Sequence, residues 1–332
     1  MSGSTLTRDS DEPPAFVSRR ITLKHATRRT SKTRRVSAPN RAMRTIHQRM
    51  VDRLWMSKAS PRMIEALKFA TGGLPGNNPL GNVLPHRNAK SRYFYLLDLR
   101  HAYQSVQPDR LAGVLRDLGL GGVQRNLGTG VDDPLDLWGE AALECYFFDQ
   151  KEGGLWFGGP ASPMLFNLYA GWLIDRQVGA FGGDGWVYTR YFDDLTFSSP
   201  RPIMDGLRRE IKRVITDAGF EASHPKSSVI DLQKRPVVVT GVGMRRDHTL
   251  FFPRRNELIA KVHQHGLTGS KLSQELEGEL GMAWAIYKAN APSSTEGRRT
   301  WLSYISPADR QLYRAWREMR KRVGKGRRTQ SR

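Results

Sequence analysis

The chain has 332 residues and a formal net charge of +21, and 39% of its residues are hydrophobic. This apolar content is enough to pack a core, which excludes a globally disordered chain. The single cysteine, Cys145, excludes an internal disulfide framework and a zinc site built from several cysteines, and it fits a reducing, cytoplasmic setting. No stretch approaches the ~18 continuous apolar residues of a membrane span, so we expect no membrane partner.

The positive charge is concentrated in two stretches of the chain. Residues 19–49 contain eleven lysines and arginines and no acid, and residues 310–332 contain ten against the single acid Glu318. Such clustering favours a polyanionic partner, most commonly a nucleic acid. The end of the chain, 323–332, is predicted to be a flexible basic tail. In 19–49 the basic residues fall on predicted strands and a helix, where they can form a binding surface.

The first part of the chain gives four expectations. Residues 1–18 are polar and acidic without a signal-peptide core, which predicts a disordered leader. Residues 15–40 are predicted to form two strands joined by a basic turn. A helix is expected over 41–56, where apolar residues recur at helical spacing. Residues 71–90 are dense in Gly, Pro and Asn, which predicts a loop.

The rest of the chain mixes hairpins and helices. A strand over 93–98 ends in Asp98, and the stretches around 187–198 and 236–253 are each predicted to form a hairpin. The remaining predictions are a connector loop at 119–130 and helices over 108–118, 135–149, 164–179, 203–218 and after Arg254. The order lacks a regular βαβ alternation, so it indicates an α+β fold.

The sequence RYFDDLTFSSP, residues 190–200, places Asp193 and Asp194 between two β-prone flanks. A solvated turn is one interpretation, because Asp is a favoured turn residue. The other joins them to Asp98, since acids at the ends of adjacent strands can converge. Three clustered acids are costly unless cations neutralise them. Oxygen ligands suit Mg²⁺ or Mn²⁺, and a pair of such ions serves phosphoryl transfer between nucleotides.

Six motifs in order, from about residue 19 to 265, resemble the reverse transcriptases, especially bacterial retron and retron-like, defence-associated enzymes. RYFDDLTFSS is similar to their Tyr-x-Asp-Asp signature with a retron-type extension. The other five matching segments begin ITLKHATRRTSK, NAKSRYFYLLDLRHAY, GLWFGGPASPMLFNLY, GFEASHPKSSVI and VVVTGVGM, the last followed by Pro-Arg-Arg. The resemblance implies a right-hand polymerase fold, which belongs to the α+β class.

The resemblance also implies a division of the chain. It places the fingers at 19–92, the palm at 93–253 with a fingers insertion at 104–150, and a helical thumb at 254–322. The basic tail, 323–332, follows the thumb. In the thumb, Arg314, Arg317 and Arg320 recur at helical spacing, either as a duplex-facing stripe or as a solvated helix face.

The implied activity is RNA-directed DNA synthesis. The template would be a structured non-coding RNA, the substrates dNTPs, and the products DNA and an RNA–DNA duplex. Two Mg²⁺ ions, or Mn²⁺, would be the cofactors. Membership of the retron-like class implies a role in antiphage defence, in which any effector protein would be a separate chain.

The resemblance assigns roles residue by residue. The three acids Asp98, Asp193 and Asp194 would hold the metals, and Lys226 would approach the leaving pyrophosphate as a charge stabiliser or acid. The incoming dNTP would be contacted by Lys24, Arg34, Tyr103, Phe157 and Gly158. Among these, Arg34 with Lys24 would meet the triphosphate, and Tyr103 would be the steric gate that rejects a ribose. Gly158 and Gly159 would let the backbone approach the nascent base pair, and Thr240 and Gly241 would lie near the primer end.

Some positions depart from the family pattern. Phe157 stands where the family's Pro-Gln-Gly has its glutamine, which places the nucleotide contact in question. His224 replaces the asparagine of the lysine motif, and Arg92 stands where retrons carry a histidine. These departures keep a second hypothesis open, a template-independent or protein-primed DNA polymerase of an abortive-infection-like system. A non-catalytic RNA-binding module is a third.

Overall fold

The computed structural model describes residues 13–24, 31–120, 139–223, 229–265, 274–291, 310–312 and 314–317. The chain divides into two compact units. Unit 1 comprises residues 1–77, 96–197 and 203–228, and unit 2 comprises 78–95, 198–202 and 229–332. Strand β3 (Tyr93–Arg100) begins in unit 2 and ends in unit 1, and strand β5 (Asp194–Ser199) begins in unit 1 and ends in unit 2.

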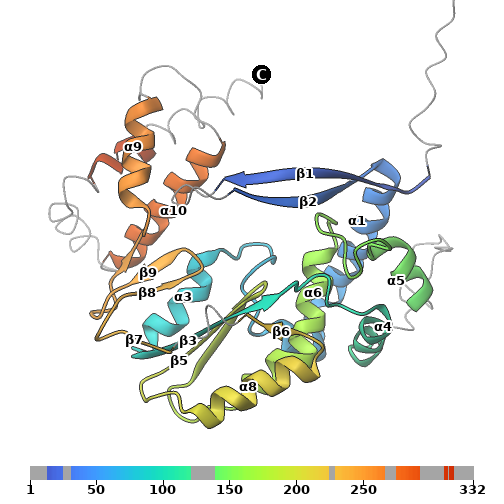
Figure 1. Cartoon of the computed structure of the whole chain (residues 1–332), viewed down its shortest axis with the longest axis horizontal. Coiled ribbons are helices and arrows are strands. Elements are labelled where there is room, and N and C mark those ends of the chain that lie inside the picture. The colour runs from blue at the N-terminus through green and yellow to red at the C-terminus, as the bar shows by residue number, and fades with distance from the viewer. Residues whose placement is uncertain are drawn as a thin grey trace, which may run out of the picture. The chain divides into compact units, whose positions relative to one another are not determined.

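The N-terminal part of unit 1 is a long antiparallel hairpin, drawn in blue in Figure 1, of β1 (Phe16–Lys24) and β2 (Ser31–Pro39). This confirms the two predicted strands, and β1 begins inside the stretch expected to be a leader. Helix α1 (Arg41–Met56) follows as predicted. Asn40 sets its start, because the Asn40 side chain accepts a hydrogen bond of 2.9 Å from the Met43 amide.

Two short elements that were not predicted follow α1, the 3₁₀ turn η1 (Ser57–Ala59) and the helix α2 (Pro61–Leu67). Their signals are local, since Ser60 caps α2 and Pro61 occupies its first turn. Helix α2 packs closely on the helical run of residues 162–178. A Cβ on Gly171 would lie 1.8 Å from the Ala66 carbonyl oxygen, so glycine is required at this crossing.

The central sheet has the strand order β4-β5-β3-β6, and β7 (Val229–Asp231) pairs with the beginning of β3. Strand β4 (Val187–Tyr191) and β5 form the predicted hairpin, and β6 (Glu221–Ala222) runs antiparallel to β3. In unit 1, Leu97 and Leu99 of β3 are buried, whereas Asp98 is half-buried on the other side of the strand. The alternation places the acid away from the packed face.

The remaining helices of unit 1 are α4 (Pro108–Asp117), α5 (Glu140–Phe147), α6 (Ser162–Ala170), η2 (Gly171–Asp175), α7 (Arg176–Val178) and α8 (Asp205–Asp217). They confirm the four helices expected between residues 108 and 218. The run α6–η2–α7 is continuous, with a π-helical turn in its middle. The loop expected at 119–130 lies almost wholly outside the described residues, which omit 121–138.

Unit 2 corrects two predictions. The loop expected at 71–90 contains helix α3 (Pro79–Asn88), whose N-terminus is capped by the Asn78 side chain. The hairpin expected at 236–253 is a three-stranded sheet, because Thr240 and Gly241 turn the chain back with positive φ angles of 46° and 82°. Its strands are β8 (Val237–Val239), β9 (Val242–Met244) and β10 (Leu250–Phe251), in the order β10-β9-β8.

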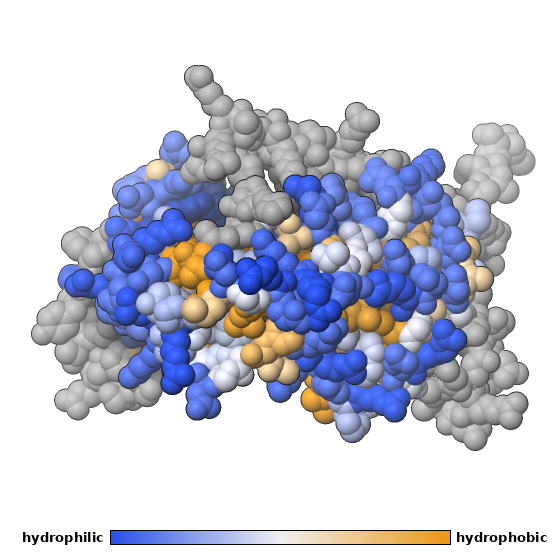
Figure 2. Space-filling model, turned by 60° about the horizontal axis from the view of Figure 1, so that its bottom comes forward, coloured by the Kyte–Doolittle hydropathy of each residue, from blue (hydrophilic) through white to orange (hydrophobic). Residues whose placement is uncertain are grey.

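Helices α9 (Arg255–His265) and α10 (Gln274–Asn290) follow, in agreement with the helices predicted after Arg254. Helix α10 packs against both α9 and β10. Arg314 and Arg317 are exposed on a further helical segment, whereas Arg320 lies outside the described residues. Among the helices that the structure describes, none is long and apolar enough to cross a membrane. Figure 2 shows a face on which hydrophilic residues predominate and hydrophobic residues form small groups.

Candidate active site

The two adjacent aspartates lie at the tip of the β4–β5 hairpin. Residues 192 and 193 form the turn, and Asp194 is the first residue of β5. The Leu99 amide of β3 donates a hydrogen bond of 2.9 Å to the Asp193 carbonyl oxygen. Asp98 precedes Leu99, so the backbone brings the two most distant acids of the prediction into adjacent strands. All three aspartates are half-buried.

Oxygen donors of this kind are those that Mg²⁺ and Mn²⁺ prefer, so the chemistry of the donor set fits the expected ions. The side chains themselves are not grouped for ligation, because no three His, Cys, Asp or Glu side chains within the described ranges form a group that could hold a metal ion. The backbone brings together the strands that carry the three acids.

Tyr103 lies in the turn that follows β3, beside the acids. Its ring stacks on Phe166 of α6, with centroids 5.2 Å apart and planes 16° apart. Burial raises the pKa of Tyr103, and the nearby charge of Asp193 raises it further, so its hydroxyl stays protonated. The sequence alone allowed an ordinary core aromatic. The structure places Tyr103 half-buried, close enough to Asp193 for their charges to interact, with its ring packed on Phe166.

Phe157, which departs from the family pattern, contacts the same tyrosine. Its ring meets the Tyr103 ring edge-on, with centroids 6.0 Å apart and an interplanar angle of 83°. The Phe157 carbonyl accepts a hydrogen bond of 2.9 Å from the Ser37 amide of β2. Gly158 follows with φ of 109°, a conformation that only glycine adopts easily. Its approach to a nascent base pair stays a prediction.

The structure describes only part of the predicted cationic residues Lys24, Arg34 and Lys226. Lys24 is the last residue of β1, and Arg34 of β2 pairs in register with Ile21. Both therefore lie on the basic hairpin, where their backbone positions are described. Lys226 lies outside the described residues, which omit 224–228.

His47 of α1 supports the glycine segment and was missed as a site residue in the sequence. Its Nδ1 accepts a hydrogen bond from the Ala161 amide at 3.2 Å, and its Nε2 donates to the Tyr146 carbonyl at 3.0 Å. Burial lowers the His47 pKa to about 4, so the ring is neutral and can accept at Nδ1. A Cβ on Gly159 would lie 2.9 Å from the His47 ring. The histidine thus shapes the loop that carries Phe157 and Gly158.

Unit 2 contains the Thr240–Gly241 turn expected near a primer end. The Thr240 hydroxyl donates a hydrogen bond of 3.3 Å to the Pro79 carbonyl and accepts one of 3.5 Å from Asn82. Both partners belong to α3. Helix α3, absent from the sequence prediction, therefore fixes this turn.

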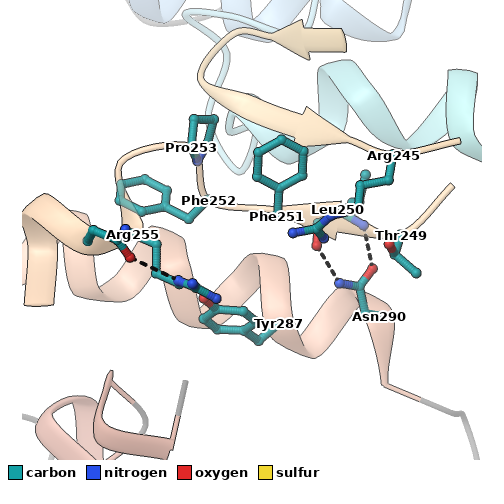
Figure 3. Close-up of a pocket in the computed structure, with 10 residues that line it drawn as sticks. Arg245, Thr249, Leu250, Phe251, Phe252, Pro253, Arg255, Tyr287 and Asn290 are labelled. Carbon is teal, nitrogen blue, oxygen red and sulfur yellow. Dashed lines mark hydrogen bonds between the residues drawn. The ribbon is translucent and has the colours of Figure 1, made fainter. Parts of the chain in front are cut away.

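A pocket of about 290 Å³ lies between β10 and the two helices α9 and α10 of unit 2 (Figure 3). Asn290 pins α10 to β10, because its side chain bonds both the amide and the carbonyl of Leu250, at 2.9 and 2.7 Å. The guanidinium of Arg245 lies over the Phe251 ring at 4.4 Å. The residues that line the pocket are Arg245, Thr249, Leu250, Phe251, Phe252, Pro253, Arg255, Asn256, Tyr287 and Asn290. Arginines and aromatic rings together are suited to phosphates and nucleobases.

Comparisons with known proteins show which proteins this chain is similar to. The chain is 30% identical over 249 residues to the retron Mx65 reverse transcriptase of Myxococcus xanthus, covering 71% of this chain and 54% of that protein. It is 26% identical over 290 residues to the retron Ec86 reverse transcriptase of Escherichia coli, covering 83% and 75%. The chain thus spans about half the length of the first relative and three quarters of the second.

Among solved structures, a telomerase from Candida albicans in complex with a fragment of telomeric RNA matches with a TM-score of 0.50 and 10% sequence identity. The match covers 89% of this chain and 56% of that one. At this identity the likeness concerns the fold, which is the right-hand polymerase fold of class α+β expected from the sequence. The family described as reverse transcriptase (RNA-dependent DNA polymerase) matches residues 23–244. The chain therefore belongs to the reverse transcriptase family and is similar to its bacterial retron members.

Proposed function

We propose that this chain is an RNA-directed DNA polymerase that copies a structured non-coding RNA into DNA. The observation that carries the proposal is the hydrogen bond from the Leu99 amide to the Asp193 carbonyl. It sets the strand that carries Asp98 beside the hairpin that carries Asp193 and Asp194. Tyr103 and Phe157 lie at the same end of unit 1 and can line the place of an incoming nucleotide.

The three carboxylates would hold two Mg²⁺ ions, with Mn²⁺ as the alternative, and the ions would neutralise charge on the reacting phosphates. Around them the chain positions the substrates. Tyr103, held by Phe166 on one face and Phe157 at its edge, would occupy the space of a ribose 2′-hydroxyl and so select dNTPs. Gly158 would let the backbone approach the new base pair.

The cations of the chain would hold the polyanions. Arg34 with Lys24 would bind the triphosphate of the dNTP, and Lys226 would stabilise the leaving pyrophosphate or donate a proton to it. The pocket of unit 2, with Arg245 and Arg255, is suited to the backbone of the RNA or of the RNA–DNA duplex. The similarity to retron enzymes supports a role in antiphage defence, with any effector protein as a separate chain acting in the cytoplasm.

The test is a double substitution at the hairpin tip. Asp193→Ala with Asp194→Ala should abolish Mg²⁺-dependent dNTP incorporation and leave RNA binding largely intact. The matched control is Asp205→Ala with Asp217→Ala, two acids on α8 whose side chains are 71% and 59% exposed. Synthesis by the hairpin variant at the rate of the control would overturn the assignment.

Phe157 favours a second candidate, a template-independent or protein-primed DNA polymerase of an abortive-infection-like system. Phenylalanine has no polar group with which to contact a nucleotide or template base as a glutamine could. Sequencing the DNA product separates the two functions. Complementarity to a co-purified RNA supports the first, and a random or homopolymeric product supports the second.

A further inference from the structure

Arg190 of β4 has a fully buried side chain, and its ion-pair partner Asp175 of η2 is fully buried too. The Arg190 Nε lies 2.9 Å from both carboxylate oxygens of Asp175, and a second guanidinium nitrogen lies 2.9 Å from one of them. Tyr188 completes the group, because its hydroxyl donates to Asp175 at 2.7 Å. Burial alone would lower the pKa of Arg190, but the charge and hydrogen bonds of Asp175 outweigh it and raise the pKa.

A buried ion pair is a poor device for stability alone. Removing two charges from water costs about as much as their attraction returns, and well-packed apolar residues of the same volume often serve as well or better. The fixed fork of the guanidinium offers something that apolar residues cannot, which is several hydrogen bonds in set directions. The role of Arg190 therefore depends on which groups its remaining N–H donors bind.

Those donors bind the turn at residues 192 and 193, which carries Asp193, and they also bind helix α6. One nitrogen of Arg190 donates to the Asn167 side-chain oxygen at 2.9 Å and to the Phe192 carbonyl at 3.2 Å. The other donates to the Asn167 carbonyl at 3.2 Å. Phe192 immediately precedes Asp193, so Arg190 binds the backbone of the turn one residue away from a catalytic carboxylate.

The turn needs such support because of its conformation. Phe192 has φ of 53°, which is unfavourable for a bulky residue and persists only where the surroundings enforce it. Its ring lies over Gly72 and Gly73, where added Cβ atoms would come within 2.9 and 2.6 Å of it. Asn167 also donates to the Gly72 carbonyl at 2.8 Å, and Thr71 donates to the Arg190 carbonyl at 2.7 Å. The Arg190 group thus fixes both sides of the turn.

The same guanidinium reaches toward Tyr103. Its central carbon lies 5.4 Å from the centroid of the Phe166 ring, and Phe166 stacks on Tyr103. A cation against an aromatic face adds attraction beyond the apolar contact. Arg190 is therefore in contact with the turn that carries Asp193 and with the ring that orients Tyr103.

We propose that Arg190 is a positioning residue that sets the geometry of the Asp193 turn and of the Tyr103 ring at the same time, with Asp175 and Asn167 as its anchors. This inference rests on the proposed polymerase function for its effect on catalysis. The structural part of the inference, which concerns how well residues 191–195 are ordered, is independent of the proposed function.

The test variant is Arg190→Lys, which keeps the charge opposite Asp175 and loses the planar fork. The matched control is Arg213→Lys on the exposed surface of α8, where Arg213 pairs with Glu210. Hydrogen–deuterium exchange of the peptide spanning 191–195 should accelerate at least about tenfold in Arg190→Lys and stay unchanged in the control. Unchanged exchange in a folded Arg190→Lys would overturn the proposal, whether or not the protein is a polymerase.

Activity provides the second readout. In steady-state dNTP incorporation, Arg190→Lys should lower kcat at least tenfold, raise the Mg²⁺ concentration for half-maximal rate, and weaken the preference for dNTPs over rNTPs. RNA affinity should remain that of the wild type. Equal Mg²⁺ dependence and sugar preference in a folded variant would contradict the positioning role. A wild-type chain without polymerase activity would overturn the proposed function instead, and the exchange measurement would still decide the role of Arg190.

A third variant covers loss of folding. Arg190→Met combined with Asp175→Leu removes both charges and keeps the core apolar, so it should fold even where Arg190→Lys does not. It should show the same faster exchange at 191–195 and the same fall in kcat. A folded double variant with wild-type exchange and wild-type kcat would show that the ion pair only fills the core, and would overturn the proposal.

Discussion

Each unit of this protein contains a buried polar cluster, and the two clusters differ in charge. In unit 1, Arg190 and Asp175 form an ion pair with both side chains fully buried. In unit 2, the fully buried His86 shares a hydrogen bond of 2.6 Å with the Ser198 hydroxyl, which donates to the Ser91 hydroxyl at 2.8 Å. Burial lowers the pKa of His86 to about 3, so the unit 2 cluster is uncharged.

The difference teaches where a buried charge is worth keeping. The His86 cluster satisfies its own polar groups and joins α3 to the end of β5, which a neutral network does at small cost. The Arg190 cluster carries a larger desolvation cost and lies directly behind the turn of the candidate catalytic hairpin. The charged cluster lies where directed hydrogen bonds must hold the strained turn at Phe192. The neutral cluster lies where it only has to join α3 to β5.

The largest expected effect is a difference in dNTP incorporation between substitutions of an acid in unit 1 and an acid in unit 2. Asp98→Asn should lower dNTP incorporation by about 10³-fold, because a carboxylate that stabilises charge at the reacting phosphates is lost. The control is Asp231→Asn in unit 2, which loses an ion pair with Arg92 at the surface. Its rate should stay close to that of the wild type. Primer extension on an RNA template measures both, and equal losses would contradict the assignment of catalysis to unit 1.

The two buried clusters should differ in stability as well. Arg190→Met leaves Asp175 as an uncompensated buried charge, which should lower the free energy of unfolding by about 3–5 kcal/mol. His86→Leu removes one neutral hydrogen-bond partner of the Ser198 hydroxyl, which keeps its bond to Ser91, so it should cost about 1–3 kcal/mol. Denaturant titration followed by circular dichroism measures the two values. A larger loss for His86→Leu would reverse the comparison.

The neutral histidines predict a pH dependence. The pKa values of His47 and His86 in the folded state, about 4 and about 3, lie below the usual 6.5. Between these values and 6.5 the unfolded chain binds more protons, so stability is full above about pH 6.5 and falls as the pH drops. Each histidine should contribute up to about 1.4 kcal/mol per pH unit in that window. Unfolding titrations from pH 7.5 to 4.5 should show a shallower fall in His86→Leu than in the wild type, and equal slopes would contradict the assignment.

A smaller effect is expected at Phe157. Phe157→Gln removes the edge contact with Tyr103 and introduces the glutamine that the family resemblance leads us to expect here. Because Tyr103 keeps its stack on Phe166, the preference for dNTPs over rNTPs should fall only several-fold, by about 1 kcal/mol of ring interaction. Single-nucleotide incorporation with matched dNTP and rNTP measures the ratio. An unchanged ratio would mean that Phe157 does not hold the tyrosine.

The smallest effect is expected at the surface of unit 2. The Arg92 side chain is 46% exposed, and it bonds Asp231 through two nitrogens at 3.0 Å. Water and salt screen such pairs, so Arg92→Gln should leave the unfolding midpoint within the scatter of repeated wild-type measurements. A clear shift of the midpoint would show that the ion pair between Asp231 of β7 and Arg92, the residue before β3, stabilises the fold.

The sequence predicted most of the elements but misjudged the segment 71–90. Gly, Pro and Asn usually mark loops, and here Asn78 and Pro79 instead begin helix α3, with Asn78 as its N-cap and Pro79 in its first turn. A hairpin over 236–253 implies one continuous strand through Thr240 and Gly241. The turn found there depends on positive φ angles that these residue types permit but do not require. Both features are fixed by tertiary contacts between α3 and the Thr240 turn.

The candidate site was predictable where its chemistry is concentrated in one motif. Asp193 and Asp194 stand out because two acids are rare between apolar strands, and Asp98 because it ends one. Arg190 and His47 were not identified, since an arginine in a strand and a histidine in a helix usually face solvent or fill an ordinary core. Only the structure shows that Arg190 bonds the Phe192 carbonyl and that His47 bonds the Ala161 amide.

Templated synthesis is the most direct test of the central claim, that unit 1 carries an RNA-directed polymerase site. The purified chain should be given a defined RNA template with an annealed DNA primer, Mg²⁺ and one dNTP at a time. We predict extension only with the dNTP complementary to the next template base, and none in the Asp193→Ala, Asp194→Ala variant. Extension independent of the template base, or equal extension by the variant, would contradict the account.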